Sequence, residues 1–230
     1  MISSKKHISD IVAIVPAYNE AKRIKEVLKV LKSTEIFKDI VVVDDGSTDN
    51  TGEVVKSVPN IRYVRNKKNK GKGYSLERAV KHTDSRIVFF CDADLNGITV
   101  EDVLEIVKPV VDGEYSMFIG VRKNTMQNIT RLSALNSGER ALKREIWDSF
   151  PSRYKIGFRI ETALNIFVKR HYGGFGYKKL EYYQTLKEQK YGVVDGLLQH
   201  IKMSYDVLLS WFLISVVDYV KNTQNKDSGE

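Results

Sequence analysis

The segment VVVDDGSTDNT, residues 41–51, constrains the fold of this chain more than any other stretch. A run of valines is typical of a parallel strand that is covered on both faces. Asp44 and Asp45 follow, and Gly46 then gives the backbone the freedom for a tight turn into a helix, which the adjacent serine or threonine is expected to cap. Ligands of open α/β sheets collect at the carboxyl ends of strands, where this pattern places both carboxylates. Taken alone, the segment is equally compatible with a plain connection between a strand and a helix.

Three further segments surround it in chain order. Residues 11–24 predict a buried strand and the start of a helix, and residues 66–80 predict a basic, glycine-containing loop that runs into a helix. Residues 87–97 predict an apolar strand that ends in Asp92-Ala93-Asp94. An Asp-x-Asp at a strand end suits a hard divalent cation such as Mg²⁺ or Mn²⁺, which usually shares its ligands with phosphate oxygens. The Asp-x-Asp alone is a weak signal. The four segments together, in this order and each at a strand end, are a strong one.

These motifs resemble a known family. VPAYNE, VVVDDGSTDNT, NKGKGYSLERAV and DAD are similar to the nucleotide-sugar half of family 2 glycosyltransferases, in the branch of the dolichol- and polyprenyl-phosphate sugar transferases. The resemblance implies an α/β GT-A fold, with a Rossmann-like, mostly parallel sheet flanked by helices and a C-terminal helical extension. The catalytic domain would cover residues 1–192, with the nucleotide-sugar half at about 8–97 and the acceptor half at about 98–192.

The resemblance also implies a donor and metal site. Asp44 would accept a hydrogen bond from the edge of uracil or guanine, and Lys72 would lie near the nucleotide. Asp94 would bind Mg²⁺ or Mn²⁺ directly and so serve catalysis, with Asp92 and Asn96 as further ligands. The implied donor-binding residues are Pro16, Ala17, Tyr18, Glu20, Asp44, Gly71, Lys72, Asp92 and Ala93. Plainer roles stay open, such as packing for Tyr18, solvation for Lys72 and turn formation for Asn96.

The implied acceptor site begins at Arg122, which ends a strand predicted over residues 116–125. Related synthases often carry Gly-Ser-Arg here, with the arginine facing an acceptor phosphate, whereas this chain has Val121 in place of the serine. Pairing of Arg122 with a nearby carboxylate is the alternative. The segment from Ser137, expected to begin a helix, resembles an acceptor-side SG-x-R-A motif, so Ser137 and Arg140 would face the acceptor. Ordinary surface pairing is an equal alternative for Arg140.

Glu161 lies in a predicted helix over residues 157–170. Many family 2 enzymes place a Glu-Asp pair here, and one of its carboxylates deprotonates an acceptor hydroxyl. This chain has Glu161-Thr162 instead, so the second carboxylate is absent. If the acceptor is a hydroxyl, Glu161 is the candidate catalytic base. If the acceptor is a phosphate monoester, no base is required, and Glu161 would orient basic side chains.

The formal net charge of +8 is concentrated in the basic loop between Arg65 and Lys72. No nucleic-acid-binding motif accompanies this cluster, so a nucleic acid is not an expected partner. A diphosphate, an anionic lipid or a phosphorylated acceptor explains the charge, and a solvated loop is the simplest alternative. Cys91 is the one cysteine of the chain, which excludes an intramolecular disulfide.

Residues 193–221 predict a long C-terminal helix, followed by a flexible tail at 222–230. Its uncharged stretch at 207–217 is too short to span a bilayer. A membrane-surface helix, a homodimer interface and a helix packed on the catalytic domain all fit it. Without an N-terminal hydrophobic signal or a membrane-spanning stretch, the chain is expected to be cytoplasmic, with peripheral attachment to the inner face of the membrane as an option.

Three classes of function compete. The resemblance favours a metal-dependent glycosyltransferase that uses a UDP- or GDP-sugar, with a polyprenyl phosphate as the first acceptor and a soluble metabolite such as phosphoglycerate as the second. A sugar nucleotidyltransferase would need a glycine-rich loop with an arginine after the first strand, where this chain has PAYNE. A catalytically silent nucleotide-sugar-binding domain is the remaining class, and the intact DAD argues against it.

Overall fold

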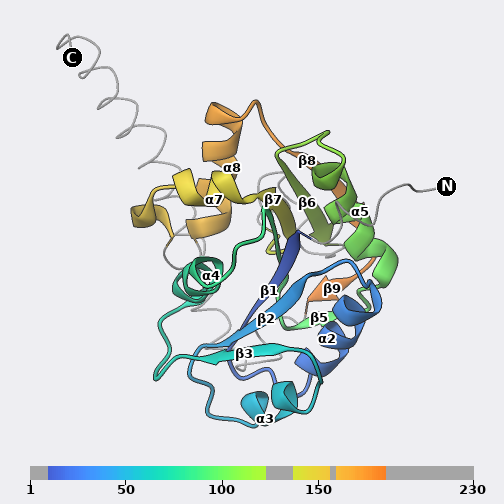
Figure 1. Ribbon diagram of the computed structural model, residues 1–230, viewed down its shortest axis with the longest axis vertical. Coiled ribbons are helices and arrows are strands. Elements are labelled where there is room, and N and C mark those ends of the chain that lie inside the picture. Colours follow the sequence, from blue (N-terminus) through green and yellow to red (C-terminus); the bar gives the residue numbers. More distant parts are fainter. Residues whose placement is uncertain (1–9, 123–136, 156–158, 185–230) are drawn as a thin grey trace, which may run out of the picture.

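A seven-stranded sheet runs through the computed structural model, which describes residues 10–122, 137–155 and 159–184 (Figure 1). The strand order is β3-β2-β1-β4-β7-β6-β8. The strands are β1 (Ile11–Ala17), β2 (Asp39–Asp44), β3 (Arg62–Arg65), β4 (Ile87–Phe90), β6 (Met117–Arg122), β7 (Arg140–Lys143) and β8 (Gly176–Leu180). The α/β fold predicted from the sequence is confirmed.

The sheet is mostly parallel. β1 pairs in parallel with β2 and β4, β2 with β3, and β6 with β8, whereas β7 is antiparallel to both of its neighbours. The chain adds β2 and β3 on one side of β1 and then returns to add β4 on the other side. The carboxyl ends of β1 and β4 therefore flank a topological switch point, which is the usual position of a ligand site in an open α/β sheet.

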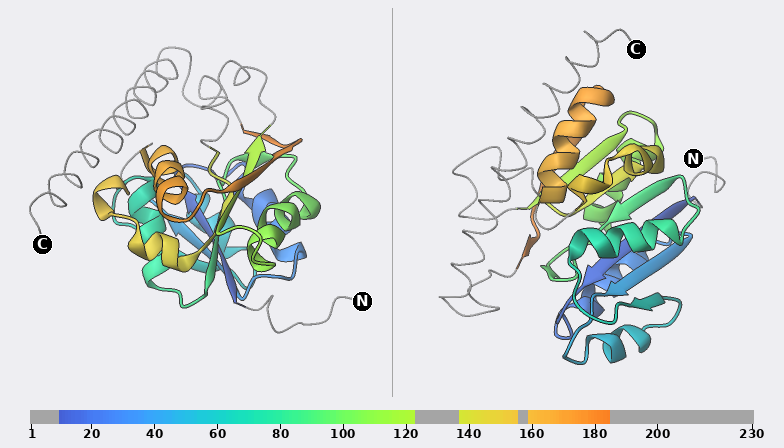
Figure 2. Two further views of the ribbon diagram at one scale, coloured as in Figure 1. Left: turned by 90° about the horizontal axis from the view of Figure 1, so that it is seen from above. Right: turned by 90° about the vertical axis from the view of Figure 1, so that its left-hand side faces the viewer.

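Helices cover both faces of the sheet (Figure 2). On one face lie α2 (Ile24–Ser33), α3 (Thr51–Lys56) and α5 (Val100–Val111), and on the other lie α4 (Lys72–Lys81), α7 (Arg144–Ser149) and α8 (Arg159–His171). Strand β1 serves both cores: Ile11, Ala13 and Val15 pack on the first face, and Val12 and Ile14 on the second. Burial on both faces explains why the strand sequences are continuously apolar.

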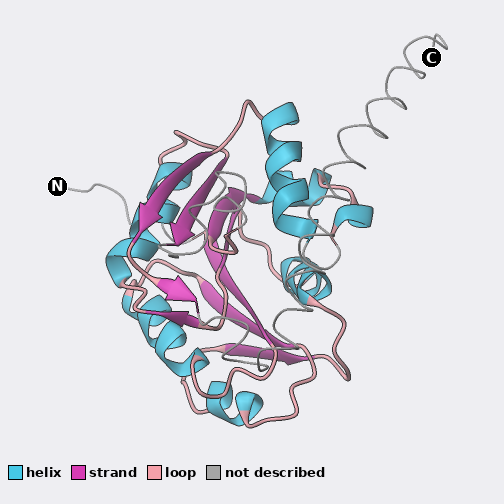
Figure 3. Ribbon diagram, turned by 180° about the vertical axis from the view of Figure 1, so that it is seen from behind, coloured by secondary structure: helices cyan, strands magenta, loops and turns pink. Residues whose placement is uncertain are grey.

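A small second sheet begins directly after the Asp-x-Asp segment (Figure 3). It consists of β5 (Leu95–Asn96) and β9 (Tyr183–Gln184), which pair antiparallel, with Asn96 opposite Tyr183. Thr99 then starts α5 with a capping box, because its hydroxyl accepts from the Asp102 N–H while the Asp102 carboxylate accepts from the Thr99 N–H. A short 3₁₀ helix, η2 (Ser152–Tyr154), lies between α7 and α8.

Two local predictions are wrong. The segment from Ser137 does not begin a helix: it enters β7, where Ala141 and Leu142 pair with Phe89 and Val88 of β4, and α7 starts only afterwards. Pairing with the central sheet thus overrides the helical pattern of this segment.

The expected hydroxyl cap on α3 is also absent. This helix begins at Thr51, and its N-cap residue Asn50 makes no side-chain capping bond. The Ser47 hydroxyl instead accepts the backbone N–H of Asn19, a contact across 28 residues of sequence that spacing along the chain does not show.

The predicted C-terminal helix at 193–221 and the tail at 222–230 lie outside the described residues. Within the described ranges, no helix combines the length and the apolar composition needed to cross a bilayer.

Candidate functional site

The loops that follow β1 and β2 are fastened to each other at the carboxyl edge of the sheet. Asn19 has a left-handed backbone (φ 57°), its N–H donates to the Ser47 hydroxyl (3.0 Å), and its side-chain oxygen accepts the Thr48 N–H (2.8 Å). The Glu20 N–H donates to the Thr51 hydroxyl (2.8 Å). These bonds hold the PAYNE turn against the turn that follows Asp45.

The predicted donor residues of this turn lie as follows. Pro16 and Ala17 end β1 beside Val43 and Asp44 of β2. The Ala17 side chain is buried and Tyr18 is half-buried. Glu20 is nearly buried, and its carboxylate pairs with Arg23 (2.9 Å) at the start of α2.

Asp44 is fully buried at the end of β2. One carboxylate oxygen accepts the Ser47 N–H (2.8 Å), and the other accepts the Tyr63 hydroxyl (2.6 Å) and lies 3.3 Å from the Arg65 guanidinium. Burial, together with the hydrogen bond to Asp44, raises the pKa of the Tyr63 phenol above its ordinary value. The structure thus surrounds Asp44 with donors that hold its carboxylate in one orientation.

Asp45 anchors the basic loop, a role that the sequence analysis did not assign. Its carboxylate accepts the N–H groups of Lys70 (3.0 and 3.1 Å) and Gly71 (2.7 Å) and the side-chain amide of Asn66 (2.7 Å). The loop backbone lies directly on Gly46, where a Cβ atom would come within 2.7 Å of the Lys68 carbonyl carbon. The sequence signal for this role was the second aspartate of the Asp-Asp-Gly triplet, because Asp44 and Asp45 bind different segments of the chain.

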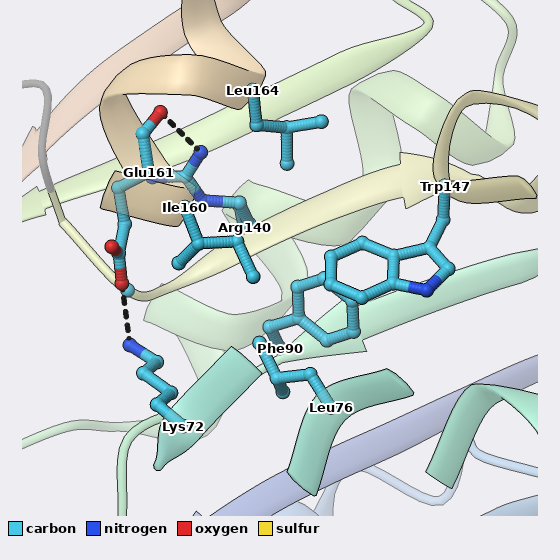
Figure 4. A pocket seen from close by; sticks show the side chains of 9 residues that line it. Lys72, Leu76, Phe90, Arg140, Trp147, Ile160, Glu161 and Leu164 are labelled. Carbon is cyan, nitrogen blue, oxygen red and sulfur yellow. Dashed lines mark hydrogen bonds and ion pairs between the residues drawn. The ribbon is translucent and has the colours of Figure 1, made fainter. Parts of the chain in front are cut away.

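Lys72 begins α4 and pairs with carboxylates from two segments that lie far apart in the sequence. Its ammonium lies 2.6 Å from the Asp92 carboxylate after β4. It also lies 2.8 Å from the Glu161 carboxylate of α8 (Figure 4). Burial alone would lower the pKa of Lys72, but the two carboxylates outweigh it and raise this pKa above its ordinary value. Lys72 is therefore a stable cation at the edge of the sheet, not merely a solvated lysine.

Asp92 lies between two cations. Besides Lys72, the Arg122 guanidinium at the end of β6 is 3.7 Å from its second carboxylate oxygen. Gly138 allows this approach, because a Cβ atom there would lie 2.5 Å from the Asp92 carboxylate and 2.6 Å from the Lys72 ammonium. The predicted acceptor-side segment at Ser137 thus lies directly against the Asp-x-Asp motif.

Arg122 pairs with a carboxylate that the sequence analysis missed. Its Nε atom is 3.2 Å from Oε2 of Glu139 and donates to the Ser137 hydroxyl (3.2 Å). Burial would lower the pKa of Arg122, but Glu139 and Asp92 outweigh it and raise this pKa. Burial in turn raises the pKa of the Glu139 carboxyl, with Arg122 opposing that effect. Of the two possibilities for Arg122, pairing with neighbouring carboxylates is what this structure contains.

Arg140 is buried. It donates to the side-chain oxygen of Asn165 (3.0 Å) and to the backbone carbonyls of Ser137 and Glu161. Burial lowers the pKa of its guanidinium. With Lys72, Gly138 and Glu161 it borders a small hollow whose apolar residues are Leu76, Phe90, Trp147, Ile160 and Leu164 (Figure 4). Surface pairing is therefore not its role.

The candidate metal ligands follow one another in the chain. Asp94 is nearly buried, Ala93 packs into the core beneath it, and the Asn96 amide donates to the Asp94 carbonyl (3.4 Å). Among the described residues, no group of three or more His, Cys, Asp or Glu side chains gathers as a metal site. Two carboxylates and an amide oxygen fit a hard cation that takes its remaining ligands from substrate phosphates and water.

Fold and site together define an open α/β protein whose charged residues meet at the switch point of the sheet. The model of the family described as "Glycosyl transferase family 2" matches residues 12–171, so the chain belongs to this family.

Two curated relatives are similar to part of this chain. It is 40% identical over 126 residues to the uncharacterized protein MJ1222 of Methanocaldococcus jannaschii, covering 52% of this chain and 51% of that protein. It is 36% identical over 105 residues to a dolichyl-phosphate beta-glucosyltransferase of Trichomonas vaginalis, covering 40% of this chain and 31% of that protein. The chain thus spans about half or less of the length of these relatives.

A similar solved structure is glucosyl-3-phosphoglycerate synthase of Mycobacterium tuberculosis in complex with Mn²⁺, UDP and phosphoglyceric acid. Its TM-score is 0.75 at 23% identity, and the match covers 88% of this chain and 77% of that one. This likeness confirms the GT-A type of fold.

Proposed function

We propose that this protein is a metal-dependent glycosyltransferase that moves a sugar from a UDP- or GDP-sugar to a phosphate-bearing acceptor, with a polyprenyl phosphate as the preferred acceptor. The observation that carries the proposal is the position of Asp92 between Lys72 and Arg122. These side chains come from the donor half and the acceptor half and meet at the switch point of the sheet.

The donor would bind across the loops after β1, β2 and β4. The turns that these loops form are already held by internal hydrogen bonds, so little ordering is needed when the nucleotide binds. Asp44 would read the base, because a buried carboxylate can accept the N–H groups of uracil or guanine once a neighbouring donor gives way. The proposed donor residues are Pro16, Ala17, Tyr18, Glu20, Asp44, Gly71, Lys72, Asp92 and Ala93.

Asp92, Asp94 and Asn96 would hold Mg²⁺ or Mn²⁺. When bound, such an ion supplies positive charge that stabilises a diphosphate leaving group. Support comes from the all-oxygen donor set and from similar solved structures in complex with Mn²⁺ or Mg²⁺ and UDP.

Lys72 would add fixed positive charge where the leaving diphosphate develops its own charge. The Glu161 carboxylate, 2.8 Å from the Lys72 ammonium, is placed to orient this lysine. A phosphate monoester acceptor is already anionic at neutral pH, so this orienting role needs no catalytic base. If the acceptor is a hydroxyl, Glu161 would be the base, and it would first have to leave Lys72.

Arg122 would face the acceptor phosphate, since the planar guanidinium donates parallel hydrogen bonds to such a group. Ser137 supports Arg122 directly, whereas Arg140 would shape the acceptor side through the backbone of Ser137. The similarity to a dolichyl-phosphate glucosyltransferase favours a lipid phosphate. The fold shared with a phosphoglycerate-binding synthase supports a soluble phosphorylated acceptor as the second candidate.

Two measurements on the full chain test this proposal. Thermal unfolding with Mn²⁺ should show stabilisation by UDP or GDP well above that by CDP or ADP, because a site built around a base N–H rejects analogues that lack it. Incubation with radiolabelled UDP-sugars or GDP-sugars should then label a polyprenyl phosphate in detergent.

The possible outcomes separate the candidates. Labelling of 3-phosphoglycerate alone would select the soluble acceptor. Binding of a nucleotide-sugar without transfer to either acceptor and without nucleotide release would leave a silent binding domain. Equal stabilisation by all four nucleotides would contradict the assignment of Asp44.

A further inference from the structure

Glu139 is a fully buried carboxylate at the edge of the candidate site, immediately before β7. Its Oε2 atom accepts the Ser137 hydroxyl (2.6 Å), lies 3.2 Å from Nε of Arg122, and is 3.5 Å from the Tyr182 hydroxyl. No described residue forms a hydrogen bond to its Oε1 atom, which is also buried. One oxygen thus collects every contact that the structure shows for this carboxylate.

Such a residue is costly for folding. A carboxylate removed from water loses favourable hydration, and an ion pair compensates for this only when the geometry is good and the remaining lone pairs are satisfied. Apolar residues of similar size often replace buried ion pairs without loss of stability. Stability therefore does not account for a glutamate with an unsatisfied oxygen at this position.

The contacts of Glu139 point to its effect on Arg122. Glu139 and Ser137 both engage the Nε edge of the guanidinium, and this directs the Nη2 atom toward Asp92, 3.7 Å away. Tyr182 backs this arrangement: its hydroxyl also donates to the Gly120 carbonyl of β6 (3.2 Å), and its neighbour Tyr183 pairs with Asn96. Tyr182 and Tyr183 therefore connect the surroundings of Arg122 to β5, the strand that carries the candidate metal ligand Asn96.

We propose that Glu139 is a positioning residue that fixes the guanidinium of Arg122 so that it meets the anionic group of the acceptor. This inference rests on the proposed function, which assigns the acceptor phosphate to Arg122. Because the planar guanidinium binds phosphate through a defined edge, a rotation about its side chain misplaces both donors at once.

The test compares Glu139→Gln with the wild-type full chain. The amide keeps the volume and one acceptor oxygen but removes the charge that holds Nε. Because a misplaced guanidinium loses a charge-assisted hydrogen bond to the acceptor phosphate, we expect the KM for the acceptor to rise about 10-fold or more. The affinity for UDP or GDP with Mn²⁺, measured by calorimetry, should change less than about 2-fold, since the contacts of the Glu139 carboxylate are to Ser137, Arg122 and Tyr182 and none is to a proposed donor or metal residue. A general structural defect would change both the acceptor KM and the nucleotide affinity.

The combination with Arg122→Ala makes the test specific. In that background Glu139→Gln should cause no further rise in the acceptor KM, because the two changes remove one interaction. Glu105→Gln is the matched control: this half-buried glutamate of α5 pairs with Lys178 and is not among the proposed donor, metal or acceptor residues, so its loss should leave the acceptor KM unchanged. Glu139→Asp keeps the charge and serves if the glutamine variant does not fold; by withdrawing the carboxylate, it should also raise the acceptor KM.

Several results would overturn the inference. A folded Glu139→Gln or Glu139→Asp variant with a wild-type acceptor KM would do so, as would an equal effect of Glu139→Gln with and without Arg122. A wild-type protein that transfers no sugar at all would instead refute the proposed function, and this inference with it.

Discussion

At the scale of single residues, alternating charges define the candidate site. Glu161, Lys72, Asp92, Arg122 and Glu139 form a continuous series in which each carboxylate contacts a cation. Each charge is costly to bury by itself and tolerable only beside its neighbours. In the proposed function, anionic substrates would displace these carboxylates from Lys72 and Arg122, and the series would keep both cations paired until a substrate binds.

Asp94 is the residue on which the metal proposal depends most. Asp94→Asn keeps the size of the side chain but removes a charged ligand, so most Mn²⁺-dependent nucleotide binding should be lost and turnover should fall roughly 100-fold or more. Calorimetric titration of UDP or GDP with and without Mn²⁺ measures this effect. Asp112→Asn, which changes an exposed carboxylate at the C-terminal end of α5, is the control. Unchanged metal-dependent affinity in Asp94→Asn would contradict the metal assignment.

At the scale of elements, α4 connects the site to the acceptor half. Its first residue, Lys72, reaches Asp92 and Glu161, and one turn further Glu77 binds two other elements. The Glu77 carboxylate accepts the Trp147 indole N–H of α7 (2.8 Å) and the ammonium of Lys155, which follows η2 (2.8 Å). The position of α4 is thus held at its first residue and near its middle.

Glu77 should make stability depend on pH. Burial alone would raise the pKa of its carboxyl, but hydrogen bonds from Lys155 and Lys81 outweigh it and keep this pKa below the ordinary value. The stabilisation is therefore complete above the pKa of an unfolded glutamate, about 4.3, and is lost as the pH falls through the lower folded value. Because solvent screens part of the interaction, Glu77→Gln should cost about 1–2 kcal/mol at pH 7.

Urea unfolding of wild type and Glu77→Gln at pH 7 and near pH 3 checks this prediction. The difference in the free energy of unfolding should shrink at the lower pH, because below about pH 4.3 the unfolded chain binds the proton at this carboxyl more readily than the folded protein does. Glu26→Gln, which removes an exposed pair with Lys29, should have little effect at either pH. A difference for Glu77→Gln that stays constant with pH would show that its charge is not involved.

At the scale of the whole molecule, the proposed donor and acceptor halves share one sheet. Strands β1 to β4 carry the proposed nucleotide loops, and β6 and β7 continue the same sheet into the acceptor side. The net charge of +8 and the uncharged stretch at 207–217 favour a protein that meets an anionic lipid surface, although this stretch lies outside the described residues.

A lipid acceptor therefore predicts membrane binding. The full chain should sediment with vesicles that contain anionic lipid, and Trp211→Glu with Phe212→Glu should abolish this, because two charges oppose burial of the stretch. Leu104→Glu with Tyr177→Glu adds the same charge at two exposed apolar residues elsewhere and should leave sedimentation unchanged. A wild-type protein that stays in the supernatant and glycosylates only a water-soluble phosphate would contradict the lipid proposal.

The sequence by itself determined the nucleotide half of the fold. Continuous apolar strands such as 41–43, glycine turns and strand-end aspartates are local signals, because each depends on neighbours a few residues away. The same signals made Asp92 and Asp94 candidate metal ligands and predicted a helix after the basic loop that contains Lys72. They failed at Ser137, where strand pairing with β4 replaced the predicted helix.

Only the tertiary structure decided how the charges pair. Glu161 and Lys72 are 89 residues apart in the chain, and Asp45 meets Gly71 across 26 residues. No sequence motif pointed to Glu139, because its proposed role depends on Arg122, which β6 places beside it. The physical reason is that a buried charge is stabilised by whichever partners the fold brings within a few ångströms, and spacing along the sequence does not encode those distances.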